Sequence, residues 1–143
     1  MDQQLIAQKL DSLRRCVQRV ESRMPASLEQ LQRDVDAQDI VALNLTRAVQ
    51  MCIDIGAHWL AVNGKGESPK TMGEVFAALA EAGLLSHALS DRLRRSVGFR
   101  NIVVHNYGAV NWEIVYGICA EHLSDFKDFA RVFSDLVEPG ESR

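Results

Sequence analysis

The chain has 143 residues, a net charge of −3, and 24% charged against 47% hydrophobic residues, which is the balance of one globular domain. It lacks the long uninterrupted apolar run of a membrane span and the basic, apolar start of a signal peptide, so we expect a cytoplasmic protein. An acidic chain does not attract nucleic acid through its overall charge, so any RNA binding must depend on a local basic patch.

Helical spacing of apolar residues runs through nearly the whole chain, whereas the alternation typical of strands is almost absent. The first expected helix carries its apolar stripe over residues 6–24 and ends there, because Pro25 disfavours helical backbone at the residue before it. Ser27 and Gln30 form a candidate capping box for a short helix that ends at about Val35.

The most regular segment spans residues 41–62, where apolar residues step alternately by four and three. Asp36 or Asp39 is expected to cap its start, and the glycines and proline of residues 63–69 end it. The seam is longer than one small bundle readily buries, which favours a homodimer. The alternative is that neighbouring helices of the same chain bury all of it.

The middle of the chain predicts a short helix followed by a longer one. Thr71 and Glu74 form a second candidate capping box, and the helix that they open is expected to end at Gly83. A further helix is expected over residues 85–104.

The last long helix is expected over residues 111–133, with Asn111 as its N-cap. Taken together, the segments predict an all-α fold: an up-down antiparallel bundle with four main helices and one or two short ones. We expect one domain over residues 1–137 and a flexible tail over residues 138–143.

The cysteines and most histidines do not form a metal site. Cys16, Cys52 and Cys119 are far apart and form no CxxC pair, so they are expected to be core thiols. The histidines outside residues 98–108 have no second histidine four residues away and form no HExxH motif, so neither a metal nor a cofactor is expected.

The stretch GFRNIVVHNYG, residues 98–108, concentrates polar chemistry in an apolar helix. Arg100 falls close to the apolar stripe through Leu93, where a guanidinium needs a partner or a cleft. His105 lies about 140° round a straight helix from Arg100, but Gly108 is a helix terminator and the last turn is expected to open. The alternatives are a packing histidine, a structural arginine and a simple turn.

A local basic patch comes just before this stretch. It consists of Arg92, Arg94, Arg95 and Arg100, four arginines within nine residues. Such a cluster can bind a phosphate backbone, but a solvated helix face has the same composition.

Arg100, His105 and Tyr107 resemble the Arg-x4-His-x-Tyr motif of the HepT-type toxins in the HEPN superfamily, with Asn101 in the polar position after the arginine. The flanking helices resemble the family too, over about residues 5–135. The resemblance implies a homodimeric bundle whose two Arg/His sets meet in a cleft at the interface. It also implies a metal-independent endoribonuclease toxin of a type II toxin–antitoxin system.

The same resemblance implies a partner and residue roles. The partner is an MntA-type minimal nucleotidyltransferase antitoxin, in a hetero-oligomer of unstated size, which can transfer AMP to Tyr107. His105 would act as general base or acid, Arg100 would hold the phosphate, and Asn101 would orient Arg100. Arg94 and Arg95 would contact the RNA substrate.

Two alternatives stay open. Helical domains of this superfamily can be non-catalytic, nucleotide-binding partner subunits of a nucleotidyltransferase, and Arg100 and His105 would then hold a nucleotide phosphate. The other alternative is a purely structural helical dimer.

Overall fold

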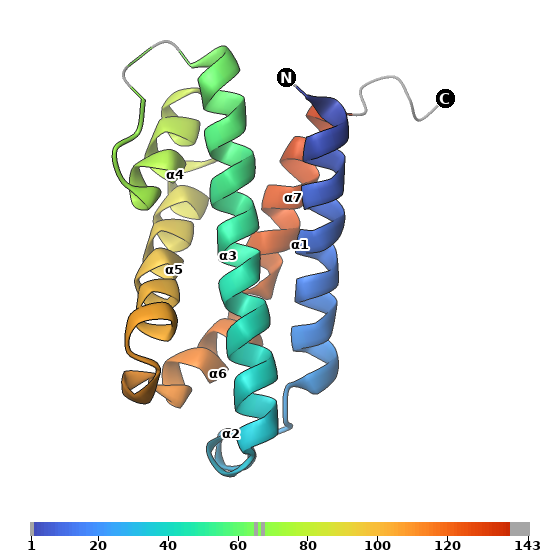
Figure 1. Ribbon diagram of the computed structural model, residues 1–143, viewed down its shortest axis with the longest axis vertical. Helices are drawn as coiled ribbons and strands as arrows, with labels where there is room; N and C mark the ends of the chain where they lie inside the picture. Colours follow the sequence, from blue (N-terminus) through green and yellow to red (C-terminus); the bar gives the residue numbers. More distant parts are fainter. Residues whose placement is uncertain (1, 65, 67, 138–143) are drawn as a thin grey trace.

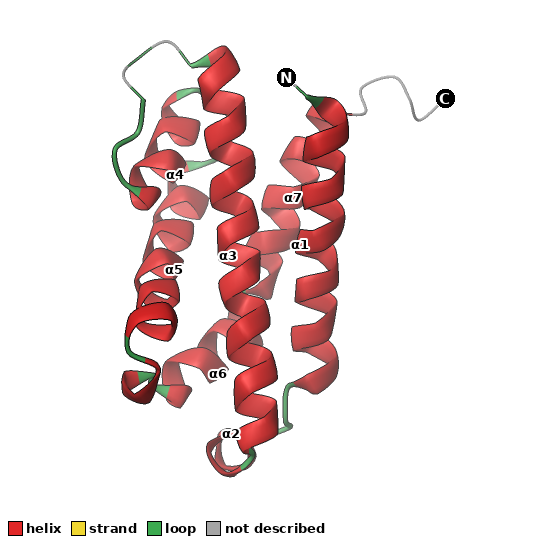
Figure 2. Ribbon diagram, viewed as in Figure 1, coloured by secondary structure: helices red, strands yellow, loops and turns green. Residues whose placement is uncertain are grey.

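The computed structural model describes residues 2–64, 66 and 68–137, and within these residues all regular secondary structure is helical, without a strand (Figure 2). The predicted tail at residues 138–143 lies outside the described part. The helices are, in chain order, α1 (Gln3–Arg23), α2 (Leu28–Arg33), α3 (Val35–Asn63), α4 (Met72–Glu81), α5 (His87–His105), the 3-10 turn η1 (Tyr107–Ala109), α6 (Trp112–Glu121) and α7 (Leu123–Val137).

Four long helices run alternately down and up, which agrees with the predicted up-down bundle (Figure 1). The helix α3 lies between α1 and α5 in this view, and α7 packs behind it against α1. The shorter α4 covers one end of α5, whereas α2 and α6 meet at the opposite end of the bundle. The motif therefore lies at the end of the bundle that α2, α6 and η1 form.

The start of α3 differs from the prediction. The cap is neither Asp36 nor Asp39 but Asp34, whose side chain accepts a hydrogen bond from the Ala37 backbone at 3.0 Å. Because α2 ends at Arg33 and α3 starts two residues later, Asp34 ends one helix and caps the next. Asp39 is left free for a different contact.

The other predicted caps are largely confirmed. Thr71 and Glu74 form a reciprocal capping box, and Gly83 has a positive φ of 83° just after α4. Ser27 accepts from the Gln30 backbone at 3.2 Å, but the Gln30 side chain accepts from Ala26 rather than from Ser27, so this box is displaced by one residue.

The predicted last helix is two helices. The chain breaks at His122, with φ −126° and ψ 7°, between α6 and α7. The buried phenylalanines of α7 enter the core beside α1, whereas α6 packs against α2 under the bundle. One straight helix cannot reach both places, so packing overrides an apolar stripe that continues without interruption through the sequence.

The seam of α3 is buried within the single chain over most of its length. Val41, Leu45, Ala48, Cys52 and Ile55 are at most 1% exposed, and only the end at Val62 is open, at 55%. Burial within one chain therefore accounts for the seam from Val41 to Ile55 but not for its end at Val62. By length and composition α3 could cross a membrane, yet more than half of its apolar part is buried in the bundle, as in the core helix of a globular protein.

The cysteines are consistent with core thiols. Cys16 and Cys52 are buried and Cys119 is half-buried. Burial raises the pKa of all three thiols, that of Cys119 to about 12, which makes them poor nucleophiles.

Candidate functional site

The motif occupies the last turns of α5 and the turn after it. Ser86 caps the start of α5, and the helix remains regular through His105, after which Asn106 forms its C-cap and donates to the Ile102 carbonyl at 2.8 Å. The expectation that the helix opens between His105 and Tyr107 is therefore confirmed, because α5 ends at His105 and the backbone leaves the helix at Asn106. Tyr107 begins η1, so it leaves the helix on a different path from Arg100 and His105.

Arg100 lies at the edge of the core, as its position on the apolar stripe predicts. Its side chain is half-buried, and its Nη1 donates to Asn101 Oδ1 at 2.9 Å. Its Nε is buried and has no hydrogen-bond partner among the described residues. Asn101 thus orients the guanidinium of Arg100, and the Nε donor of Arg100 is available to an incoming acceptor.

His105 is exposed at the end of α5. Because the helix is regular between the two residues, the side chains of Arg100 and His105 point about 140° apart. A single chain therefore does not bring the two on to one face.

Tyr107 makes a contact that the sequence does not predict. Its hydroxyl donates to Asp39 Oδ1 at 2.5 Å, and its ring meets Trp112 edge-on with centroids 6.0 Å apart. Burial, followed by the hydrogen bond and the negative charge of Asp39, raises the pKa of Tyr107 above its ordinary value. The residue is still 40% exposed, so it is accessible from solvent.

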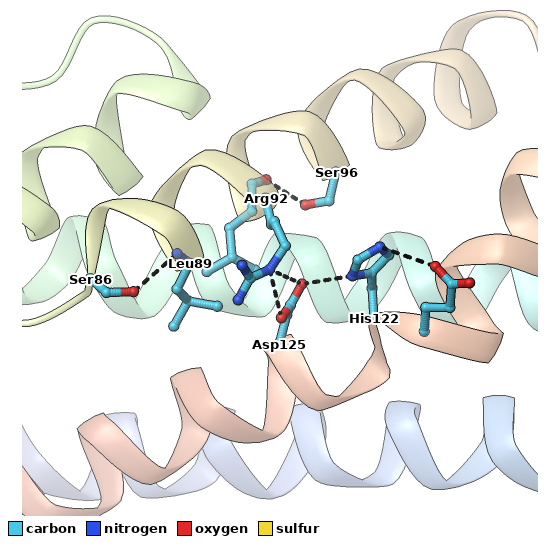
Figure 3. Close-up of polar contacts among 8 residues, drawn as sticks. Ser86, Leu89, Arg92, Ser96, His122 and Asp125 are labelled. Atoms are coloured by element: carbon cyan, nitrogen blue, oxygen red, sulfur yellow. Dashed lines mark hydrogen bonds and ion pairs between the residues drawn. The ribbon is translucent and has the colours of Figure 1, made fainter.

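Arg92 is not part of a free basic patch. Its Nε lies 3.0 Å from both carboxylate oxygens of Asp125, which is buried on α7, and His122 Nδ1 approaches the same carboxylate at 3.6 Å (Figure 3). The pair joins α5 to α7 at the break after α6. Arg92 is therefore a structural ion-pair residue, which corrects its assignment to the RNA-binding patch.

Arg94 and Arg95 remain on the surface, one to two turns before Arg100. Arg94 pairs with Asp91 at 3.7 Å on the same exposed helix face, and both arginines line a shallow hollow of about 470 Å³ beside Gly98. The structure leaves both accessible but does not bring them into contact with Arg100, His105 or Tyr107.

A mainly apolar groove of about 540 Å³ runs between α5 and the α6–α7 segment. Its lining includes Phe99 and Ile102 of α5 and Ile114 and Ile118 of α6 but neither Arg100 nor His105. Ile102 and Ile114 are 43% and 55% exposed, so the groove presents an apolar surface next to the motif.

The sequence and fold both resemble known proteins. Residues 13–133 match the ribonuclease HepT-like family. The mRNA nuclease HepT of Shewanella oneidensis is 35% identical over 130 residues, which cover 90% of this chain and 95% of that protein.

Solved structures superpose on most of the chain. A crystal structure of a toxin–antitoxin with AMP-PNP contains a chain with 34% identity and a TM-score of 0.85, and the match covers 92% of this chain and 98% of that one. A tri-AMPylated Shewanella oneidensis HEPN toxin in complex with MNT antitoxin gives 35% identity and a TM-score of 0.84, covering 94% and 98%. The Bacillus subtilis cytosolic protein YutE, at 12% identity and a TM-score of 0.83 (coverage 97% and 92%), shares the fold.

Proposed function

The chain belongs to the ribonuclease HepT-like family and is a ribonuclease, and from this premise we propose that it is the metal-independent endoribonuclease toxin of a cytoplasmic HEPN/MNT toxin–antitoxin system. The observation that carries the proposal is the position of Arg100, Asn101, His105 and Tyr107. All four lie at one helix end in a chain that is 35% identical to an mRNA nuclease over nearly its full length.

The residue types fit cleavage of RNA without a metal. The 2′-hydroxyl of the substrate attacks the adjacent phosphorus and the 5′-oxygen of the next nucleotide leaves, which gives a 2′,3′-cyclic phosphate or its hydrolysed form. His105 exchanges a proton with one of these oxygens, which its exposed position allows. Arg100, oriented by Asn101, stabilises the charge on the phosphate through its free donors.

The working site is completed by a second copy of the chain. One chain points Arg100 and His105 about 140° apart, so an Arg100 and a His105 that act on the same phosphate come from different protomers. The exposed apolar side chains of Ile102, Val104 and Ile114 flank the motif and supply a surface for such an interface.

Tyr107 is the site of inhibition by an MntA-type antitoxin. A related toxin is AMPylated in complex with MNT antitoxin, and the hydroxyl of the partly exposed Tyr107 is an acceptor of the required kind. An attached AMP adds negative charge and bulk where RNA phosphate must bind. Arg94 and Arg95 contribute to holding the RNA backbone.

Cleavage of RNA in EDTA tests the proposed activity. His105→Ala and Arg100→Ala are each expected to lower the cleavage rate by at least about 100-fold with the helical content unchanged, because acid–base and charge stabilisation are removed. His87→Ala at the other end of α5 and Arg131→Ala on α7 are matched exposed controls and should retain activity. Cleavage that persists in both motif variants would remove these residues from the active site. Nucleotide binding without any cleavage would favour the non-catalytic alternative.

Intact mass after coexpression with the antitoxin tests the modification. We expect one or more added AMP groups on the wild-type chain and on Tyr116→Phe, and none on Tyr107→Phe. Added AMP on Tyr107→Phe would place the acceptor elsewhere.

A further inference from the structure

Another hollow, which contains no motif residue, lies between α1 and α3, which run side by side (Figure 1). It has a volume of about 340 Å³. We call it the arginine groove; its lining residues are Ser12, Arg15, Cys16 and Arg19 from α1 and Asn44, Arg47 and Met51 from α3. The spacing of three and four residues on each helix places these side chains in two facing rows.

The arginine groove carries positive charge without compensation. Arg15, Arg19 and Arg47 are exposed, its lining contains no acidic residue, and the ion pairs seen in the described residues use other arginines. By contrast, the apolar groove beside α5 contains Glu121 and Asp125. Arg15 donates a hydrogen bond to the Ser12 hydroxyl at 3.4 Å, which leaves its charge uncompensated. In a chain with a net charge of −3, three arginines without an ion pair among the described residues form a local anion-attracting surface in this hollow.

Cys16 shows that the three cations converge. The charges of Arg47, Arg19 and Arg15 all act to lower the pKa of this thiol, so all three lie around it. Burial outweighs them and the pKa of Cys16 is raised. The thiol is therefore not an activated nucleophile, and the groove is suited to binding rather than to covalent chemistry.

Asn44, which lines the groove, carries an unpaired acceptor. It is only 3% exposed, and its Nδ2 donates to the Ile40 carbonyl at 2.8 Å, which fixes the orientation of the amide. Its Oδ1 is buried and has no hydrogen-bond partner among the described residues. A buried acceptor beside three cations suits a ligand that carries both an anionic group and a hydroxyl donor.

We propose that the arginine groove is a second RNA-binding site, which holds a backbone phosphate between the arginines and a ribose 2′-hydroxyl against Asn44. Arginine forks match phosphate oxygens, and the 2′-hydroxyl is the donor that distinguishes RNA from DNA. An acidic protein surface would satisfy the arginines but would have no particular use for a buried acceptor. The inference rests on the proposed RNA substrate and extends it to a face that the Arg-x4-His-x-Tyr motif does not reach.

The position along α3 allows one strand to use both sites. Arg47 follows Asp39, the residue that binds Tyr107, by eight residues, which is roughly 12 Å along the helix. A strand of a few nucleotides covers that distance. The groove would then fix the register of the RNA while Arg100 and His105 act on the phosphodiester.

Binding of a fluorescent single-stranded RNA by the His105→Ala protein in EDTA tests the proposal. Adding Arg15→Ala and Arg47→Ala should weaken binding at least about tenfold and should reduce the slope of log K against log salt by roughly 0.7, the contribution of the one phosphate that the groove holds. The matched control adds Arg14→Ala and Arg131→Ala, which remove the same charge from exposed ion pairs outside the groove. Circular dichroism should show the same helical content for both.

A DNA strand of the same sequence tests the role of Asn44. The parent should prefer RNA, and Asn44→Ala should lower that preference several-fold with the salt slope unchanged. The proposal is overturned if the groove variant binds RNA as tightly as the control variant, or if it loses affinity for the antitoxin and keeps it for RNA. Failure of the proposed function looks different: the parent then binds no RNA, or the wild type binds RNA through the groove without cutting it.

Discussion

The hydroxyl of Tyr107 is held by a residue that lies 68 positions earlier in the chain, Asp39 on α3. Burial of the ring and this hydrogen bond both favour the protonated form of the tyrosine. The folded protein keeps the phenolic proton to higher pH than a free tyrosine would, because burial and the Asp39 carboxylate both disfavour the phenolate. Any transfer of AMP to this oxygen must displace the proton, and Asp39 is the group already placed to accept it.

Asp39→Asn should bring the ionisation of Tyr107 to lower pH. Tyr107 and Tyr116 are the two tyrosines of the chain, so Tyr116→Phe leaves one phenol to follow by its ultraviolet absorbance. In this background, the titration midpoint is expected to fall when Asp39 is replaced and to stay unchanged in Asp36→Asn, an exposed control on the same helix turn. Equal midpoints in the Asp39 and Asp36 variants would show that the hydrogen bond does not control the phenol.

The stability of the fold at alkaline pH should also depend on the ionisation of Tyr107. Above a pH of about 10 the unfolded chain loses the phenolic proton while the folded chain retains it, so the free energy of unfolding falls as pH rises through that range. In Asp39→Asn the pKa of Tyr107 in the folded protein is closer to its pKa in the unfolded chain, so the free energy of unfolding should fall less steeply with pH. Urea unfolding at a series of alkaline pH values measures it, with helical content as the check on the folded state.

Single residues divide into those whose role the sequence indicates and those whose partners are distant. Arg100 on an apolar stripe predicts a partly buried guanidinium, and Asn101 beside it predicts the contact between them. Nothing in the sequence pairs Asp39 with Tyr107 or Arg92 with Asp125, because these contacts join helices far apart in the chain. An acidic residue near a helix start is usually predicted to be an N-cap, as Asp39 is here. Because Asp34 caps α3, Asp39 can bind Tyr107 instead.

At the scale of elements, local signals predict helix starts better than they predict breaks. Caps such as Thr71, Ser86 and Asn111 bond to backbone amides within three residues, so their chemistry is visible in the sequence. The break at His122 depends instead on where α6 and α7 must pack. The ion pair of Arg92 with Asp125 then fixes α7 against α5 just after the break.

The contact of α3 with α4 depends on a glycine. A Cβ added at Gly56 would lie 2.7 Å from Leu79 Cδ1 and 2.8 Å from Val75 Cγ1, both buried. Gly56→Ala is therefore expected to destabilise the fold by about 1–2 kcal/mol, since the clash exceeds the helix-propensity gain of alanine. Gly73→Ala on α4, where a Cβ meets nothing within 4 Å, should be neutral or slightly stabilising. Thermal unfolding of both variants measures the difference. Equal Tm values would show that α4 shifts to accommodate the added methyl group without loss of stability.

At the scale of the whole molecule, the single chain has a buried core, but its Arg100 and His105 side chains do not face each other. The core buries most of the α3 seam internally, so most of the periodicity that favoured a dimer is satisfied within one subunit. Exposed apolar side chains lie around the end of α5, at Ile102, Val104 and Ile114, and also along α3, at Val35, Leu43 and Val62. The sequence thus predicts the bundle and the motif residues, but the arrangement between copies cannot be read from it, because a regular helix separates Arg100 from His105 whichever copy is considered.

Mixing two inactive variants tests whether the site spans two protomers. If Arg100 of one chain works with His105 of the other, a heterodimer of Arg100→Ala with His105→Ala retains one site with both groups intact. Random exchange of equal amounts makes half of the dimers mixed, each with one of two sites, so about a quarter of the wild-type cleavage rate should return. Each variant mixed with itself should stay inactive under the same refolding or exchange conditions. A site formed within one chain would give no recovery, since every chain in the mixture then lacks either the arginine or the histidine.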